Sequence, residues 1–395
     1  MAVRREPERR QASASPGKEG RALETPRNEP RPTDDATAAN AAARASAGAP
    51  ANAGAPAPRA PFGGRALAFA LVALAALLVT LWVEPRTSIN PRALLPDMVA
   101  GTAHRPYVYR ALVPILTRAA ASVVPPSAQN ALADLTARSA VLRDALRWES
   151  AHATWYLIVF LIHWGALTLF GLCMRDLARR ALALGDGPAL GAAVAAVLLV
   201  AIHFGYQNFV YDFPQLALFA LGLALLRRGA LAGWYALLPI GVLNKETFVL
   251  MSVVFALTQW RRYSSRSLAV HLTAQFTIAA AVLAAIHIAC HGNPGTPVEF
   301  HLQRNLHYQP GARQLVHDAV YWGFWVTALW HWREKRALAG VALTLGVLLV
   351  GSTLFLGYLG EYRDYYEVYP VLFLMVAHTV MRVAAKQPVE DPWPV

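Results

Sequence analysis

A lysine and a glutamate stand side by side in an apolar stretch of this sequence. Lys245 and Glu246 interrupt the run 231–257, which is otherwise dominated by Leu, Val, Phe and Ala. Ionisable groups in an apolar environment are expensive unless they are paired, so such groups are a functional hypothesis by default. The stretch therefore raises the question whether the two charges hold a substrate or neutralise neighbours.

Two arginines earlier in the chain form a second motif. Arg105 and Arg110 bracket Tyr107 and Tyr109 in HRPYVYRALVPIL. Guanidinium groups bind phosphate through paired hydrogen bonds, and tyrosine is enriched at the headgroup level of membranes. This pattern is suited to holding a lipid-linked phosphate. The alternative that these side chains only anchor the chain at the interface stays open.

Membrane helices are the elements expected to position these residues. The chain of 395 residues is 56% hydrophobic and 15% charged, which is outside the usual range for a soluble globular protein. Lipid-facing backbone must satisfy its own hydrogen bonds, and the alternating segments of a β-barrel are absent. We predict an all-α polytopic protein with ten spans. They are 66–83, 153–174, 188–206, 214–226, 230–243, 247–260, 268–290, 314–332, 337–358 and 370–382.

Charge in the short loops predicts the orientation of these spans. Every second loop is basic, with Arg175, Arg179, Arg180, Arg227, Arg228, Arg261, Arg262, Arg266, Arg333, Lys335, Arg336, Arg382 and Lys386. Positive loops stay on the cytoplasmic side, so both termini are expected there. The Ala- and Pro-rich residues 1–62 are predicted to be a disordered cytoplasmic tail, 63–385 the transmembrane domain and 386–395 a short cytoplasmic end.

The first outside loop, 84–152, is the longest. Its second half, NALADLTARSAVLRDALRW, spaces four leucines by three, seven and four residues, with only Ser139 interrupting the stripe. This spacing predicts an amphipathic helix lying on the membrane surface.

The outward side is expected to collect acids and bases from five loops. They are Asp97, His104, Arg105, Arg110, Tyr211, Asp212, Asn244, Lys245, Glu246, His301, Arg304, His307, Glu361, Arg363, Asp364 and Glu367. A carboxylate and basic groups beside lipid are what glycosyl transfer from a polyprenyl-phosphate sugar needs. The carboxylate takes a proton from the acceptor hydroxyl, and the cations hold the departing phosphate.

Four motifs together carry a family resemblance. RPYVYRALVPIL, YDFPQLALFALGL, LNKETFVL and GEYRDYYEVYPVLF, in this order, resemble a broad set of bacterial polytopic proteins that are distantly similar to GT-C glycosyltransferases. The likeness covers about residues 66–385 and implies a protein of the bacterial inner membrane. Two departures are the lack of a paired acidic dipeptide in the first outside loop and of a large soluble C-terminal domain.

The resemblance also implies roles for single residues. Asp97, the only acid between Glu84 and Asp134, becomes the candidate base, and Asp212 and Glu246 would orient groups or bind sugar hydroxyls. The residues expected to bind phosphate or substrate are Arg105, Tyr109, Arg110, Asn244, Lys245 and Arg363. The expected partners are a polyprenyl-phosphate-linked sugar or another lipid-linked substrate, together with membrane lipids.

Other ligand classes find little support in the sequence. His291, His301 and His307 are separated by ten and six residues, which matches no compact metal-ligand motif, so no metal or other cofactor is expected. The formal charge of +12 comes without a zinc signature or P-loop, so nucleic-acid binding is not expected either.

Two alternatives to an enzyme stay open. A flippase or transporter of a lipid-linked or polar substrate also uses broken helices with charges near a half-helix end. A non-catalytic membrane component would use the same charges only for pairing between helices. The sequence does not decide whether the chain is an enzyme, and it leaves the oligomeric state open.

Overall fold

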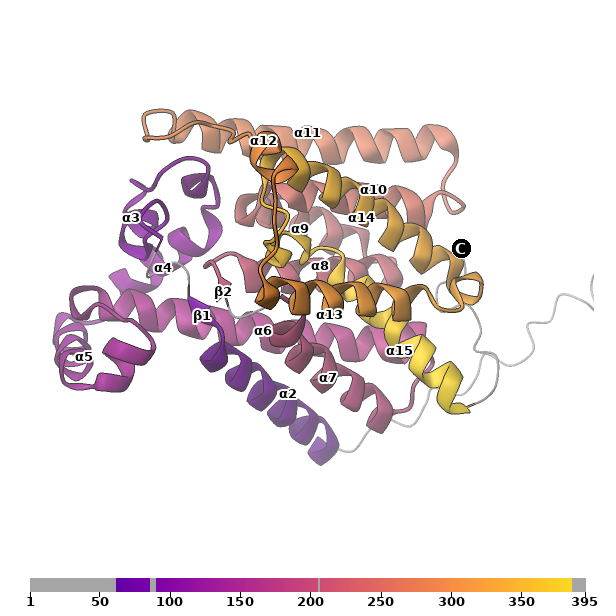
Figure 1. Cartoon of the computed structure of the whole chain (residues 1–395), viewed down its shortest axis with the longest axis horizontal. Helices are drawn as coiled ribbons and strands as arrows, with labels where there is room; N and C mark the ends of the chain where they lie inside the picture. The colour runs from indigo at the N-terminus through magenta and orange to yellow at the C-terminus, as the bar shows by residue number, and fades with distance from the viewer. Residues whose placement is uncertain (1–61, 86–89, 205–206, 386–395) are drawn as a thin grey trace, which may run out of the picture. The chain divides into compact units, whose positions relative to one another are not determined.

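The computed structural model describes residues 62–85, 90–204 and 207–385 (Figure 1). The predicted disordered tail, apart from Phe62, and the predicted C-terminal end 386–395 lie outside these residues. The predicted all-α class is confirmed for the described residues. Their β structure is one parallel pairing of two residues each, β1 (Glu84–Pro85) with β2 (Gln207–Asn208).

The helices follow one another in the order of the apolar runs. The longer ones are α2 (Phe62–Trp82), α4 (Leu112–Ser122), α5 (Pro126–Arg138), α6 (Ala153–Ala181), α7 (Asp186–Phe204), α8 (Asp212–Arg228), α9 (Leu231–Asn244), α10 (Leu250–Gln259), α11 (Ser265–Ala289), α13 (Ala312–Leu329), α14 (Arg336–Leu356) and α15 (Tyr369–Ala385). The short ones are α3 (Leu95–Ala100), η2 (Tyr107–Tyr109), η3 (Val141–Ala145), η4 (Ser150–His152), η5 (Glu246–Val249), α12 (Leu302–Leu306), η6 (Trp332–Lys335) and η7 (Tyr362–Tyr365).

Five segments of the described chain are long and apolar enough to cross a membrane, as in a multi-pass membrane protein. They are Gly64–Trp82, Ser150–Ala181, Asp186–His203, Ser265–Ala289 and Trp332–Leu356. The other five predicted spans also contain helix, namely α8, α9, η5 with α10, α13 and α15. Ten crossings therefore remain a prediction, because α9 has only 14 residues and α10 only 10.

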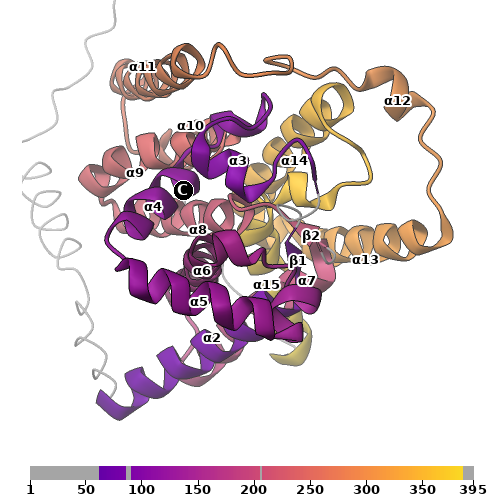
Figure 2. The same cartoon turned by 90° about the vertical axis from the view of Figure 1, so that its left-hand side faces the viewer.

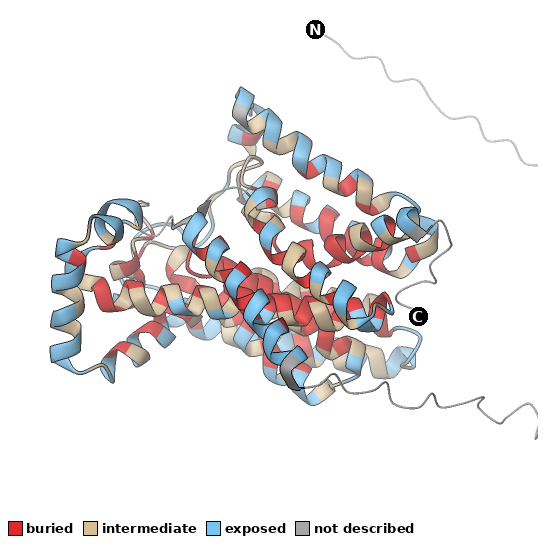
Figure 3. Ribbon diagram, turned by 90° about the horizontal axis from the view of Figure 1, so that it is seen from below, coloured by how far each residue is buried: buried red, intermediate tan, exposed pale blue. Residues whose placement is uncertain are grey.

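The core forms where α6 packs against α2, α7 and α8 (Figure 1). Gly171 of α6 lies at the crossing of three helices. A Cβ at this position would come 2.5 Å from Val72 of α2 and 2.8 Å from Val197 of α7. Small residues let membrane helices approach closely in this way. Figure 3 shows the buried residues gathered where the helices pack against one another and the exposed residues on their outer faces.

The described part of 84–152, the loop predicted to be the first outside one, folds into several helices at one end of α6. Figure 2 shows α3, α4 and α5 gathered there. The predicted amphipathic helix is not continuous. Helix α5 ends at Arg138, Ser139 has an extended backbone, and its Oγ accepts a hydrogen bond from Leu142 N at 3.3 Å. The serine side chain thus begins a new turn, η3, and divides the leucine stripe into two parts.

The charged turn predicted at LNKETF is a break between two helices. Helix α9 ends at Asn244, and Lys245 is extended with φ −159° and ψ 134°. Phe248 of η5 then packs on Gly241 of α9, where a Cβ would come within 2.2 Å of its ring. Only glycine permits this contact, which folds η5 back onto α9 and holds Lys245 and Glu246 at the break.

Candidate functional site

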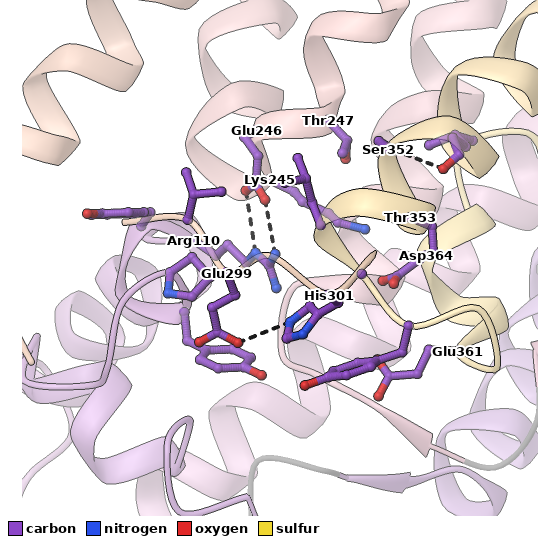
Figure 4. Close-up of a pocket in the computed structure, with 18 of the residues that line it drawn as sticks. Arg110, Lys245, Glu246, Thr247, Glu299, His301, Ser352, Thr353, Glu361 and Asp364 are labelled. Atoms are coloured by element: carbon purple, nitrogen blue, oxygen red, sulfur yellow. Dashed lines mark hydrogen bonds and ion pairs between the residues drawn. The ribbon is translucent and has the colours of Figure 1, made fainter. Parts of the chain in front are cut away.

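Charged residues from separate segments line one cavity of about 280 Å³ (Figure 4). Its walls come from η2, the break between α9 and η5, α11 with the loop after it, α14 and η7. The polar side chains in the lining include Arg110, Lys245, Glu246, Thr247, Glu299, His301, Ser352, Glu361, Arg363 and Asp364. The apolar ones include Leu283, Val298, Leu349 and Leu356. Charge and hydrocarbon therefore meet in one space.

Arg110 holds Glu246 in a two-pronged ion pair. Its Nη2 lies 3.0 Å from Glu246 Oε1 and its Nε 3.4 Å from Oε2, and its Nη1 donates to the Tyr211 hydroxyl. Burial raises the pKa of Glu246, but the Arg110 charge and hydrogen bonds outweigh it and lower the pKa to about 2. All three nitrogens of Arg110 are thus engaged, so its main effect is to position Glu246.

Lys245 belongs to a buried polar network beside the cavity. Its Nζ lies 3.2 Å from Glu367 Oε1, with side-chain exposures of 4% and 0%. Burial lowers the pKa of Lys245, but Glu367 and Asp364 outweigh it, so the pKa lies above its ordinary value. The same carboxylate oxygen accepts hydrogen bonds from Thr247 and, at 3.3 Å, from Gln215.

Asn244 extends this network to α8. Its Nδ2 donates to Gln215 Oε1 and to the Tyr211 carbonyl, both at 3.0 Å. Its side chain is fully buried, so it stabilises the break between α9 and η5 and does not line the cavity.

Arg363 is surrounded by carboxylates. It donates to Glu361, and its Nη1 lies 3.8 Å from Asp364 Oδ1 and 3.9 Å from Asp212 Oδ2. These charges outweigh burial and hold the pKa of Arg363 well above its ordinary value. Among the described residues, Nη1 finds no hydrogen-bond partner. A buried donor without a partner at the cavity wall is available to a ligand.

Asp212 is fully buried at the start of α8. Its Oδ2 accepts a hydrogen bond from Phe209 N at 2.7 Å, which closes the turn before the helix. Burial raises the pKa of Asp212 above its ordinary value, against the opposing charge of Arg363. Asp212 therefore lies behind the cavity, at ion-pair distance from Arg363.

A histidine and a glutamate form a further pair in the loop after α11. His301 Nε2 lies 3.3 Å from Glu299 Oε2, and Arg92 Nη1 lies 3.2 Å from the same oxygen. The His301 ring packs on Tyr358 with 4.2 Å between centroids. Burial together with the charges of Arg304 and Arg92 lowers the pKa of His301, so its neutral form is favoured.

Most of the predicted site residues come together, and two do not. Tyr109, Arg110, Lys245, Glu246 and Arg363 line the cavity, with Tyr109 stacked 3.9 Å from the His287 ring. Asn244 and Asp212 are buried beside it.

Asp97 and Arg105 are absent from the cavity lining. Asp97 is half-buried in α3, where its backbone carbonyl accepts hydrogen bonds from Thr102 N and Ala103 N. Arg105 donates to the Gly295 carbonyl and so ties the first outside loop to the loop after α11.

Several residues of the site were not given a catalytic or binding role from the sequence. Glu361, Asp364 and Glu367 were expected on the outward side, and their spacing of three was the available signal. Gln215 lies three residues after Asp212 on α8 and could have been found by helical spacing. Glu299 and Thr247 had no such signal. Within the described chain, no three His, Cys, Asp or Glu side chains are grouped to hold a metal ion.

Comparison with known proteins found no matching protein-family model, no similar curated protein and no similar solved structure. The chemistry of the cavity is therefore the basis for inferring a function, because one fold can carry different functions.

Proposed function

We propose that this chain is a GT-C-like glycosyltransferase of the bacterial inner membrane, which moves a sugar from a polyprenyl-phosphate donor on the outer face. The observation that carries the proposal is the composition of the cavity. Lys245, Arg363 and Asp364 line the same space as the apolar side chains of α11 and α14. Cations for a phosphate, a carboxylate for a proton and an apolar wall for a lipid are thus combined.

Lys245 and Arg363 are the groups proposed to hold the donor phosphate. Among the described residues, Arg363 Nη1 has no hydrogen-bond partner, and Lys245 has three N–H donors but one carboxylate partner, Glu367. Both cations therefore keep donors for a phosphate. When the bond between the anomeric carbon and the phosphate oxygen breaks, the phosphate keeps the electron pair. Preorganised cations stabilise that developing charge.

Asp364 is the carboxylate proposed as general base. Glu361 and Glu246 are each hydrogen-bonded to an arginine, whereas Asp364 Oδ1 is 3.8 Å from Arg363 and outside hydrogen-bond range. Asp364 can therefore accept the proton of an acceptor hydroxyl while the hydroxyl oxygen attacks the anomeric carbon. The sequence-based candidate Asp97 is the competing assignment, and it lies outside the cavity lining.

The lipid part of the donor is proposed to lie along α11 and α14. Leu283 of α11 and Leu349 and Leu356 of α14 form the apolar side of the cavity. Each CH₂ group buried there contributes about 0.8 kcal/mol to binding, which favours a polyprenyl chain over a water-soluble donor. A nucleotide sugar would gain nothing from this wall.

A transporter is the second candidate, because α9 and η5 form a broken helix with Lys245 at the break. Purified protein in liposomes separates the two functions. The probe is tritiated undecaprenyl-phosphate glucose in the bilayer, with solubilised native membranes as acceptor source. Transfer of tritium to an acceptor, with release of undecaprenyl phosphate, supports the enzyme. Movement of intact glycolipid between leaflets without transfer supports the transporter and contradicts the proposal.

A further inference from the structure

A second cavity of about 390 Å³ lies next to the one described above. The two share Tyr107, Tyr358, Glu361 and Arg363 in their linings. The volume falls in the usual range of small-molecule sites, ~300–1,000 Å³. Two neighbouring cavities with a common wall suit a reaction that joins two substrates.

Each arginine of the second cavity lies over an aromatic ring of the same cavity. Arg304 Cζ is 4.4 Å from the Tyr358 ring centre, and Arg363 Cζ is 4.4 Å from that of Phe209. Arg92 Cζ is 5.8 Å from the ring centre of Tyr107. Stacking fixes the plane of a guanidinium group and leaves its N–H donors at the edge of that plane, where an anion can bind to donors that no carboxylate uses.

The charge balance of the second cavity favours an anion. Among the described residues, its lining has Arg92, Arg304 and Arg363 but one carboxylate, Glu361. The first cavity balances three cations with four carboxylates, Glu246, Glu299, Glu361 and Asp364. Of the three arginines, Arg92 and Arg363 have carboxylate partners, whereas no ion pair involves Arg304 among the described residues.

Arg304 is held in place by its neighbour. The buried Asn305 donates from Nδ2 to the carbonyls of Thr353, Leu354 and Gly357 at 2.9–3.1 Å. Its Oδ1 accepts from Leu359 N at 3.3 Å. These bonds fix α12 to the end of α14, so Arg304 is presented from an anchored element although its own side chain is exposed.

We propose that the second cavity binds an anionic sugar, that is, a hydroxylated ring with a phosphate or carboxylate group. The arginine edges bind the anionic group, with Arg304 the main contributor, and the faces of Tyr308 and Tyr358 contact the ring. That this sugar is the acceptor of the transfer rests on the proposed function. The shared wall of Glu361 and Arg363 brings its hydroxyl groups next to Asp364.

Calorimetry on the purified full-length protein in detergent tests this site without any need for turnover. The probes are glucose 1-phosphate, glucuronate, glucose and inorganic phosphate, each titrated alone. The variants are Arg304→Gln and Tyr358→Leu. Arg138→Gln is the control, because Arg138 is an exposed arginine at the end of α5, outside both cavities.

We expect the tighter of glucose 1-phosphate and glucuronate to bind at least tenfold more tightly than glucose or inorganic phosphate. The identity of the tighter one distinguishes a phosphate from a carboxylate as the anionic group. Arg304→Gln is expected to weaken that binding at least tenfold and Tyr358→Leu at least threefold, while Arg138→Gln leaves it unchanged.

Three results would overturn the proposal. They are equal binding of glucose and the anionic sugars, inorganic phosphate binding as tightly as either sugar, and equal weakening by Arg138→Gln and Arg304→Gln. If Arg304→Gln loses its thermal unfolding transition, it is replaced by Arg304→Lys, which keeps the charge but lacks the planar guanidinium edge and is expected to weaken binding of the anionic sugar at least threefold. Sugar transfer without anionic-sugar binding would refute this site and leave the proposed function standing.

Discussion

Single residues in the cavity divide into those that hold a ligand and those that hold other residues. Arg110 uses all three nitrogens on Glu246 and Tyr211, so it is a positioning residue. Lys245 and Arg363 keep donors that other side chains do not use. The two charges of LNKETF therefore have different partners, since Glu246 pairs with Arg110 and Lys245 pairs with Glu367.

The Lys245–Glu367 pair predicts a strong effect on stability. Because both side chains are buried, Lys245→Met leaves a carboxylate without its cation and is expected to lower the free energy of unfolding by about 3–5 kcal/mol. The double variant Lys245→Met with Glu367→Gln removes both charges and should recover part of this loss. Denaturant unfolding in detergent measures both. A double variant as unstable as the sum of the singles would contradict a structural pair.

Glu246 predicts a pH dependence. Its pKa in the folded protein, about 2, lies below its ordinary value of 4.5, so it binds a proton less readily than in the unfolded chain. The resulting stability is complete above about pH 4.5 and is lost as the pH falls towards 2. The melting temperature of Glu246→Gln should therefore fall less between pH 6 and pH 3 than that of the wild type.

Glu149→Gln is the control for this measurement, because Glu149 is exposed and makes no ion pair among the described residues. We expect the melting temperature of Glu149→Gln to fall as much between pH 6 and pH 3 as that of the wild type. If Glu246→Gln and Glu149→Gln behave alike, the pair with Arg110 does not contribute to stability.

Helices and their breaks are the scale at which the sequence was most informative. Each of the ten apolar runs predicted as spans contains helix, because a run of apolar residues in lipid has few alternatives. The break at Lys245 was also expected, from the arginines that flank it on both sides. The division at Ser139 was not, because it depends on one side-chain hydrogen bond that competes with the helix.

The contact between η5 and α9 predicts the effect of a single methyl group. In Gly241→Ala the new Cβ would overlap the Phe248 ring, so we expect a loss of about 1–3 kcal/mol in stability. Because Phe248 fixes the chain after Lys245 and Glu246, activity should fall as well. Gly340→Ala in α14 is the matched control, since nothing lies within 4 Å of its added Cβ. It should be neutral or stabilising by about 0.5–1 kcal/mol. If Gly241→Ala and Gly340→Ala change the thermal unfolding and the activity equally, the contact between Gly241 and Phe248 does not have this role.

The whole molecule was harder to predict than its parts. Sequence order placed Lys245, Glu246, Arg110 and Arg363 on one side of the membrane, and the structure brings them to one cavity. The sequence did not reveal that Lys245 pairs with Glu367, because Glu367 is far away in the chain and is brought to Lys245 by packing. Asp97 was named from a resemblance to the first loop of other proteins, and the position of α3 depends on loop contacts that no local pattern encodes.

The predicted orientation can be tested on the entire chain. In a variant with Cys173 and Cys290 changed to alanine, a single cysteine is introduced at Ser139 or Ser265. A membrane-impermeant maleimide added to intact spheroplasts should label Ser139→Cys, in the first outside loop, and spare Ser265→Cys, at the start of α11. If only Ser265→Cys is labelled, the topology is the reverse of the predicted one and the cavity lies on the cytoplasmic side.

The central claim, that the cavity carries out sugar transfer with Asp364 as base, is tested most directly by one comparison. Tritium transfer from undecaprenyl-phosphate glucose is measured for the wild type, Asp364→Asn and Asp97→Asn. Loss of a general base lowers the rate by about 100-fold or more, so Asp364→Asn should be nearly inactive. Asp97→Asn should stay within about twofold of the wild type, because Asp97 lies outside the cavity lining. An inactive Asp97→Asn beside an active Asp364→Asn would contradict the account.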